Sequence, residues 1–532
     1  MSLKIGTPSS LVINHLQKID KPFLQNILTF NRGIERETLR LTSNGLLATS
    51  NHPKAFGSKL THPKITTDFS EAQLELITPV HSSSKSAIKD LDQIHRYLYQ
   101  EIDQELLWAA SMPCVLPDDD KIPLAYYGKS NLGNLKTTYR SGLGYRYGRA
   151  MQTICAVHYN FSFTESFWKW LKHFEKSNEP DNDFITRRYF DLMRNFRQCS
   201  WLLTYLFGAS PAVCNSFVGD RDHGLTKFDP DTSYLPHATS LRSGNLGYQS
   251  DAQAEHMEVC YNSLDTYISS LASAIRDEYP PYKEIGVQVG KQYRQINTSI
   301  LQSEAEFYSS IRAKRVPEPG ENFLTCLHRN GVQYVEIRLL DVNPYLPLGI
   351  DETEINFLDT FLLYCLLKNS PEHNQVTCQE VGQNAMTTVN QGRSSELILT
   401  DNGCRRSIKE WGHEILSDMA PHAGILDRTF NTDRYQTSLN IQQQRIKNPN
   451  STPSGQIISD MEEQEKSFLN FAMDQTLKHR KNFKSRPLSS NELTEFADIA
   501  RQSLEDQKNI EAADDKDFNQ YLIDTLALYQ EV

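Results

Sequence analysis

QYVEIRLLD, residues 333–341, has the pattern of a β-strand with one apolar and one charged face. Side chains alternate across a strand, so Glu336 and Arg338 point to one face while the aliphatic residues beside them point to the other. Such strands are typical of an antiparallel sheet that has helices on its apolar face and a ligand on its polar face. We therefore expect this stretch to bring a carboxylate and a guanidinium into one cavity.

Other runs have the length and the β-branched or aromatic content of strands. They alternate with helical and polar stretches, and they lie at residues 33–41, 67–78, 156–163 and 294–301. In the third run, His158 and Asn160 share the polar side. The pattern predicts an α+β fold in which a mainly antiparallel sheet has helices packed outside it.

The C-terminal part of the chain has a different pattern. NPNSTPSG at residues 448–455 is typical of a linker, and Ser489 with Glu492 forms the capping-box pattern that opens a helix. Amphipathic spacing predicts a helical tail with helices at residues 460–481, 489–508 and 518–529. We therefore divide the chain into a body, residues 1–448, and an acidic helical C-terminal region, residues 449–532.

The composition is that of an ordinary globular protein. Of 532 residues, 39% are hydrophobic and 23% are charged, which argues against a disordered chain and against a coiled coil. The longest apolar stretches, residues 201–214 and 355–367, are interrupted and shorter than the ~20 residues that span a membrane. Residues 1–20 lack the pattern of a secretory signal.

The nine scattered cysteines favour free thiols in a reducing cytoplasm.

The net charge of −11 lies mostly at the C-terminal end. Residues 451–532 hold 16 acidic and 9 basic residues, so they carry −7 of the total. The rest of the chain is nearly neutral, and its bulk charge does not indicate a nucleic-acid partner.

Glu35 and Glu37 lie two positions apart on a predicted strand, so their carboxylates share a face about 7 Å apart along the chain. An isolated pair of this kind is more often a solvated strand face than a functional site. Asp68 and Glu75 belong to the neighbouring run, and His158 and Glu336 add groups on polar faces of further runs. Carboxylates in this number suit hard divalent cations such as Mg²⁺ or Mn²⁺ rather than zinc.

Arginines supply the complementary charge. Arg338 shares a strand face with Glu336, the arrangement that a transferring phosphoryl group needs, although a simple surface ion pair would have the same spacing. Arg242 follows the segment YLPHATSL and could hold a substrate carboxylate with two hydrogen bonds, although a single arginine is more often a solvated surface residue. Three further cations lie close together at Arg312, Lys314 and Arg315. They could contact nucleotide phosphates or belong to an ordinary exposed turn, and the sequence favours neither interpretation.

The stretch KTTYRSGLGYRYGR, residues 136–149, mixes basic and aromatic residues. It stands alone in a nearly neutral body, so we interpret it as a substrate loop rather than as an RNA-binding surface.

With these residues located, the chain resembles the bacterial glutamate–cysteine ligases of the gamma-proteobacterial type. The resemblance covers residues 20–370 in order. It rests on blocks such as GIERETLRL at 33–41, THPKITTDFSEAQLELITPV at 61–80, YRYGRAMQTICAVHYNFS at 145–162, YLPHATSLRSGNLGY at 234–248, RQINTSILQSEAEFYSSIRAKRV at 294–316 and YVEIRLLDVNPYLPLGID at 334–351.

The resemblance implies a curved antiparallel sheet that forms a funnel like that of glutamine synthetase, holding ATP, metal ions and glutamate on its polar face. It implies that residues 1–448 are the catalytic body. It places the metal ligands at Glu35, Glu37, Asp68, Glu75, His158 and Glu336. It makes Arg338 and Glu336 catalytic, with Arg242 and Arg338 at the glutamate. It places the cysteine pocket at Phe69, Tyr139, Arg140, Gln152, Tyr248 and Tyr308.

The implied reaction joins the γ-carboxylate of L-glutamate to the amine of L-cysteine through γ-glutamyl phosphate. This is the first step of glutathione biosynthesis, with ATP as co-substrate and Mg²⁺ or Mn²⁺ as cofactor, and feedback inhibition by glutathione is a further expectation. Three alternatives stay open on the residues: a ligase with another amine acceptor, a two-metal phosphohydrolase, and a non-catalytic binding protein with an enzyme ancestor.

Overall fold

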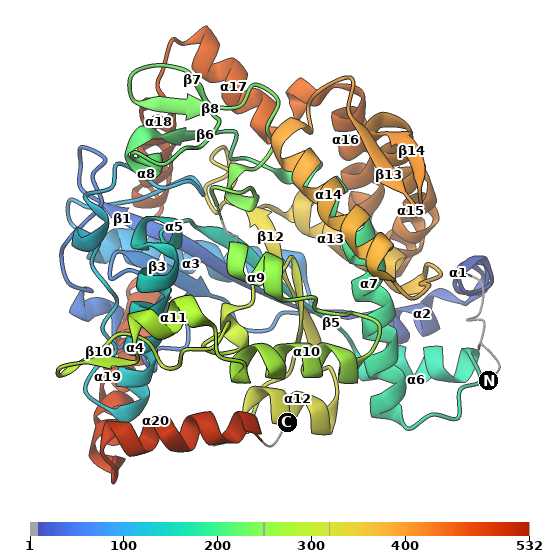
Figure 1. Ribbon diagram of the computed structural model, residues 1–532. Helices are drawn as coiled ribbons and strands as arrows, with labels where there is room; N and C mark the ends of the chain where they lie inside the picture. Colours follow the sequence, from blue (N-terminus) through green and yellow to red (C-terminus); the bar gives the residue numbers. More distant parts are fainter. Residues whose placement is uncertain (1–8, 248–249, 319, 531–532) are drawn as a thin grey trace.

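One antiparallel sheet organises the computed structural model, which describes residues 9–247, 250–318 and 320–530 (Figure 1). Its strand order is β11-β12-β5-β1-β3-β2, and β4 pairs with β1. The bounds are β1 Phe30–Leu41, β2 Ile65–Thr67, β3 Gln73–Ile77, β4 Leu106–Leu107, β5 Ala156–Phe163, β11 Ile311–Lys314 and β12 Tyr334–Asp341. Every pairing in this sheet is antiparallel, as the sequence predicts.

The register of these strands aligns polar residues into a row. Glu37 of β1 pairs with Glu75 of β3, Glu35 of β1 pairs with His158 of β5, and Glu336 of β12 pairs with Asn160 of β5. Directly opposed residues in an antiparallel pair share a face of the sheet. Side chains from four strands therefore converge on one face.

The opposite face is apolar and covered by helices. Ile34, Tyr159 and Val335 are each 0% exposed there. The long helices α7 and α13 pack against each other, α7 contacts β11 and β12, and α3 contacts β1 and β3. Their bounds are α3 Ser84–Glu101, α7 Asp181–Phe207 and α13 Glu352–Leu367. Because these aliphatic and aromatic side chains are buried under the helices, the register of the strands is fixed and the polar side chains lie on the opposite, uncovered face.

The predicted substrate loop at residues 136–149 is wrong, because most of it belongs to helix α4, Asn131–Tyr147, which is followed by α5, Arg149–Gln152. The side chain of Ser130 caps α4 by accepting a hydrogen bond from Gly133 N. The glycines that suggested a loop allow close packing instead: a Cβ on Gly142 would lie 2.1 Å from the side-chain oxygen of Gln302.

Two strand predictions differ from the structure. The run 67–78 holds the last residue of β2, a turn and the strand β3, and the turn is closed by a hydrogen bond from Asp68 N to Gln73 O. The run 294–301 forms no strand, because side chains there bond to nearby backbone: Asn297 Oδ1 accepts from Ser299 N, and Asn297 Nδ2 donates to Leu301 O. Asparagine offers this local alternative to a strand ladder.

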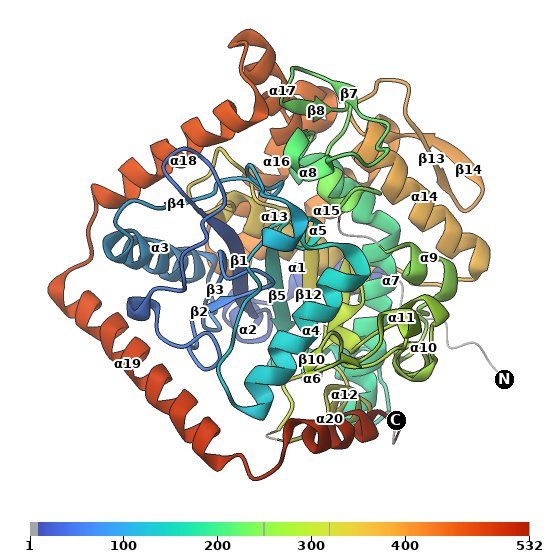
Figure 2. The same ribbon diagram turned by 60° about the vertical axis from the view of Figure 1, so that its left-hand side comes forward.

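The C-terminal helices run along the outside of the body, as Figure 2 shows. They are α17 Pro453–Glu463, α18 Phe468–Lys484, α19 Ser490–Ala513 and α20 Phe518–Ala527. The capping box of Ser489 and Glu492 is confirmed, but the single helix predicted at 460–481 is wrong because the chain turns at Glu465, where φ is 50°. The linker-like residues 448–455 form a short turn and the start of α17, where Ser454 N donates to Gly208 O.

The remaining elements surround this framework. The helices are α1 Ser9–Lys18, α2 Lys21–Ile27, α6 Glu165–Phe174, α8 Asn215–Val218, α9 Asp251–His256, α10 Leu264–Arg276, α11 Pro280–Ile285, α12 Phe323–Asn330, α14 Gln375–Gln391, α15 Ile408–Phe430 and α16 Arg434–Lys447. The small sheets are β6 Ala212–Cys214 with β8 Thr232–Tyr234 and β7 Thr226–Lys227, β9 Gln288–Val289 with β10 Gln292–Tyr293, and β13 Ile398–Asp401 with β14 Cys404–Ser407. Within the described ranges, every helix is too short or too polar to cross a bilayer.

Candidate active site

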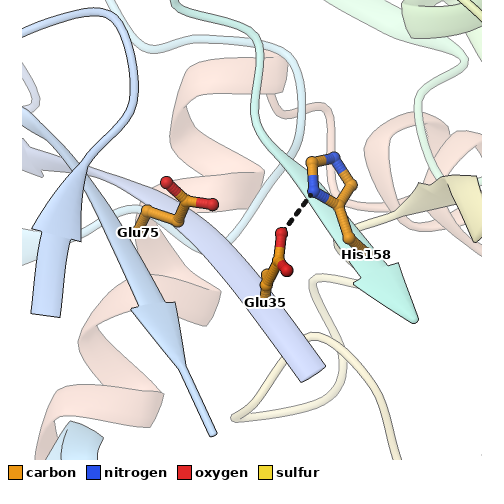
Figure 3. A group of neighbouring side chains, drawn as sticks. All are labelled: Glu35, Glu75 and His158. Atoms are coloured by element: carbon orange, nitrogen blue, oxygen red, sulfur yellow. Dashed lines mark hydrogen bonds and ion pairs between the residues drawn. The ribbon is translucent and has the colours of Figure 1, made fainter. Parts of the chain in front are cut away.

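Three side chains from adjacent strands point toward one another on the polar face (Figure 3). Glu35 of β1, Glu75 of β3 and His158 of β5 each offer a ligand atom, and these atoms lie within 4.8 Å of one another. His158 Nδ1 is 3.1 Å from Glu35 Oε2, and His158 Nε2 is 3.6 Å from Glu37 Oε1. The predicted grouping of Glu35, Glu37, Glu75 and His158 is therefore present in the structure.

The carboxylates in this group oppose one another. Burial, followed by the negative charges of Glu35, Asp68 and Glu37, raises the pKa of Glu75 well above its usual range. Burial and the nearby Asp68 raise the pKa of Glu37 to about 8. Protons or a cation must offset this charge, because several ionised carboxylates in one poorly solvated site repel each other.

Glu336 lies at the other end of the row, among cations. Its Oε1 accepts a hydrogen bond from Arg338 Nη1 at 2.9 Å, and Lys314 Nζ is 3.6 Å from its Oε2. Burial opposes ionisation of Glu336, but the charges of Lys314, Arg338 and Arg312 together hold its pKa well below the usual range. Burial and Arg338 also lower the pKa of His158, which keeps the imidazole neutral and able to bind a metal ion.

A cavity of about 590 Å³ opens beside this row. Arg338, Arg242 and Tyr308 line it, together with residues of α7, α9 and α14. Arg242 is buried, with its Nε 2.7 Å from Asp341 Oδ1, which fixes the direction of the guanidinium. Because Arg338 contacts Glu336 and also lines the cavity, the carboxylate cluster and the cavity form one site.

The residues expected around the acceptor come from α4, α5 and two loops. Arg140 Nε donates to the carbonyl of Asp68, and Gln152 Nε2 donates to Tyr308 Oη at 3.0 Å. Phe69 is buried, and Tyr139 is half-buried on α4. Tyr248 lies outside the described residues. The contacts link α4 to the β2–β3 turn and α5 to the loop of Tyr308.

The sequence matches those of known proteins. A family model described as glutamate–cysteine ligase matches residues 14–388. The glutamate–cysteine ligase of Alcanivorax borkumensis is 47% identical over 498 residues, which cover 93% of this chain and 95% of that protein. The glutamate–cysteine ligase of Pseudomonas putida is 45% identical over 501 residues, which cover 94% and 95%. This chain belongs to the glutamate–cysteine ligase family.

Solved structures agree with membership of the ligase family. The crystal structure of the Francisella tularensis glutamate–cysteine ligase in complex with AMP matches with a TM-score of 0.88 and 33% identity, covering 95% of this chain and 99% of that chain. A bifunctional glutathione synthetase from Pasteurella multocida shares the fold with a TM-score of 0.70 at 21% identity, covering 92% of this chain and 57% of that chain. The resemblance to the family and the α+β fold class are therefore confirmed.

The three cations proposed for nucleotide phosphates in this family member lie in different surroundings. Arg312 Nη2 donates to the carbonyls of Ala305 and Phe307, and Arg315 donates to the carbonyls of Gly331 and Asn330. Arg312 lies opposite Glu336 in the sheet, and Lys314 Nζ is the one of the three within ion-pair distance of Glu336, 3.6 Å from its Oε2. The phosphate role of all three stays a prediction, and the geometry favours Lys314.

Lys136 of α4 is a cation near the carboxylate cluster that the sequence pattern did not single out. Its Nζ lies 5.5 Å from the ring centre of Tyr127, and Arg140 Cζ lies 4.4 Å from the same centre. Burial and Arg140 lower the pKa of Lys136 to about 8, while Glu75 acts in the opposite direction. The i, i+4 spacing of Lys136 and Arg140 would have signalled a shared helix face, had residues 136–149 been predicted as a helix.

Proposed function

We propose that this protein uses ATP to join the γ-carboxylate of L-glutamate to the amine of L-cysteine, the first step of glutathione biosynthesis. One observation carries the proposal: a carboxylate cluster large enough for metal ions lies beside Arg338, which lines the cavity. The glutamate–cysteine ligases of Alcanivorax and Pseudomonas cover almost the whole chain, and the Francisella ligase binds AMP, which supports a nucleotide site here.

The residues present fit divalent cations. The Glu75 side chain makes no hydrogen bond or ion pair among the described residues, and two buried oxygens, Glu336 Oε2 and Asn160 Oδ1, have no hydrogen-bond partner. We propose Glu35, Glu37, Asp68, Glu75, His158 and Glu336 as the groups that would hold Mg²⁺ or Mn²⁺. The bound cations would supply positive charge for the oxygens of ATP and glutamate.

Arg338 acts on the phosphoryl group. The γ-carboxylate of glutamate is a poor electrophile, so it first attacks the γ-phosphorus of ATP to give γ-glutamyl phosphate and ADP. Charge on the transferring oxygens is offset by Arg338, whose guanidinium is held by Glu336 at 2.9 Å. Arg242 is oriented by Asp341 toward the same cavity, where it binds the glutamate carboxylate.

The acceptor pocket completes the reaction. The cysteine amine attacks the γ-carbonyl carbon of γ-glutamyl phosphate and inorganic phosphate leaves. We assign Phe69, Tyr139, Arg140, Gln152, Tyr248 and Tyr308 to the walls of this pocket. Exclusion of water by these side chains protects the acyl phosphate from hydrolysis. We infer that glutathione, which contains the γ-glutamylcysteine unit, competes for the same pocket.

We place the reaction in the cytoplasm, where ATP and reduced thiols are available. All nine cysteines of the chain are free, which fits that compartment.

The test measures ADP release from ATP and Mg²⁺ with glutamate and cysteine added singly and together, and identifies the product by mass. Dependence on both amino acids with formation of γ-glutamylcysteine supports the proposal. ATP hydrolysis that needs no glutamate would indicate a phosphohydrolase. Equal use of ammonia and cysteine would replace the assignment with a general carboxylate–amine ligase.

A further inference from the structure

Two cations share one aromatic ring at the acceptor side of the site. Lys136 and Arg140 lie one helical turn apart on α4, with charged groups 5.5 Å and 4.4 Å from the centre of the Tyr127 ring. The ring itself is held in place, because Tyr127 is buried and its hydroxyl donates to Thr67 O at 2.6 Å. The two cations are thus presented by a rigid support.

Two hydrogen bonds to backbone carbonyls hold the Arg140 guanidinium in place. Its Nε donates to the Asp68 carbonyl and its Nη1 donates to Lys136 O at 3.0 Å. These contacts hold the guanidinium against the turn that precedes Glu75. Arg140 is also an attractive charge for the Glu75 carboxylate, so its charge acts on the carboxylate cluster.

The Lys136 ammonium group, unlike the Arg140 guanidinium, is held by none of the described backbone carbonyls. Its side chain is half-buried, and among the described residues its Nζ makes neither a hydrogen bond nor an ion pair. Contact with an aromatic face offsets only part of the cost of desolvating an ammonium group. Glu75 is a negative charge near this ammonium group, but among the described residues no carboxylate lies in ion-pair contact with it, which leaves its Nζ open to an anionic ligand.

We propose that Lys136 binds the α-carboxylate of the acceptor amino acid, with Arg140 as its neighbour. The inference rests on the proposed function, because the same helix carries Tyr139 and Arg140 into the acceptor pocket. A carboxylate approaching this site meets the negative field of Glu35, Glu37 and Glu75, and the two cations on Tyr127 offset that repulsion. Lys136 therefore selects amino acids over simple amines.

The test compares an acceptor that has a carboxylate with one that has none. Hydroxylamine attacks γ-glutamyl phosphate to give γ-glutamyl hydroxamate and phosphate, and it carries no carboxylate. For Lys136→Met, kcat/KM for cysteine should fall about 10- to 100-fold, the usual range for loss of a charge-assisted hydrogen bond. KM should account for most of this fall. Hydroxamate formation from ATP and glutamate should change by less than about twofold, and Lys136→Arg should restore much of the use of cysteine.

Lys129→Met is the matched control, because Lys129 is exposed just before α4, and it should behave as wild type. Equal losses with cysteine and hydroxylamine would overturn the proposal and move Lys136 to the phosphoryl step or to folding, which thermal unfolding would report. Unchanged use of cysteine would also overturn it. Failure of the wild-type chain to make γ-glutamylcysteine would instead remove the proposed function, so the two failures are distinguishable.

Discussion

The two faces of the central sheet treat buried carboxylates in opposite ways. On the helix-covered face, Asp359 receives Arg32 Nη2 at 2.5 Å and Nε at 3.0 Å, and the Tyr159 hydroxyl donates to it at 2.7 Å. On the polar face, Glu37 and Glu75 have no lysine or arginine partner within ion-pair distance among the described residues. On the covered face the charge of Asp359 is met by Arg32 within the chain, whereas on the polar face Glu37 and Glu75 are left without a lysine or arginine partner in the part of the chain that the structure describes.

This difference separates stability from function. In a buried ion pair that is fully hydrogen-bonded, the attraction between the partners offsets much of the free-energy cost of taking both charges out of water. Removal of one partner leaves the other charge buried and alone, which destabilises the fold. A cluster of like charges destabilises the ligand-free fold, because the charges repel one another. Bound cations remove this repulsion and stabilise the fold. The same chemical change, carboxylate to amide, should therefore have different consequences on the two faces of one sheet.

The largest effect is expected for Glu75→Gln on the polar face. The change keeps the shape of the side chain but removes a charge that holds the cations, so turnover should fall about 10³-fold or more. The metal-free protein should unfold at the same or a higher denaturant concentration, because a half-buried carboxylate that repels its neighbours has gone. Steady-state rates over a range of Mg²⁺ and unfolding in EDTA measure the two quantities. Normal rates at low Mg²⁺ would remove Glu75 from the site.

The matching change on the covered face is Asp359→Asn. It leaves Arg32 buried without a negative partner, so the free energy of unfolding should fall by about 3–5 kcal/mol. The folded fraction should keep its kcat and its Mg²⁺ requirement, because this side chain points away from the site. Tyr159→Phe is the control, since it removes a single hydrogen bond and should cost about 1 kcal/mol. A stable but inactive Asp359→Asn protein would contradict the separation of the two faces.

A smaller effect is expected for Arg338→Lys, at the border between the carboxylate cluster and the cavity. Lysine keeps the positive charge but loses the planar fork that contacts phosphate oxygens. We expect kcat to fall about 10- to 100-fold while KM for glutamate changes little, because the contact strengthens in the transition state. The opposite pattern, with kcat unchanged and KM raised, would assign Arg338 to binding glutamate in the ground state.

Side-chain alternation predicted the two faces but not their register. It placed Glu336 and Arg338 together and His158 on a polar face, as the structure has them. Which residue of one strand opposes which residue of another depends on turns and packing that no single run contains. The pairing of Glu37 with Glu75 therefore became visible only in the folded chain. The roles within the site came from the family resemblance.

The missed elements have local physical causes. Alternation at residues 294–301 came from Asn297 and its neighbours, whose polar side chains bond to a loop backbone. The glycines of α4 resembled loop residues, although Gly142 is required there by contact with Gln302. The error at α4 also concealed Lys136, because its relation to Arg140 exists only on a helix.

The smallest effect expected is a pH dependence of Mg²⁺ binding that belongs to the polar face alone. Burial and Asp68 raise the pKa of Glu37 to about 8, and burial and the neighbouring carboxylates raise the pKa of Glu75 well above its ordinary value. A carboxyl whose pKa is higher in the folded than in the unfolded chain contributes stability that is complete below pH ~4.5 and is lost as the pH rises through the folded value. The contribution of Glu37 to the stability of the metal-free protein should therefore fall between about pH 5 and pH 8.

Magnesium must displace the protons that these carboxyls hold at neutral pH. Its apparent affinity should rise about tenfold per pH unit for each proton displaced, and the rise should flatten above pH 8 as Glu37 becomes ionised without help. The unfolding midpoint at a fixed, subsaturating Mg²⁺ concentration, minus the midpoint in EDTA, reports this affinity. Glu37→Gln should reduce the slope of that difference against pH, whereas Asp359→Asn should lower both midpoints and keep the slope. Equal slopes in wild type and Glu37→Gln would mean that Mg²⁺ releases its protons from groups other than Glu37. The contrast between a self-neutralised covered face and a polar face neutralised by its ligands would then be wrong.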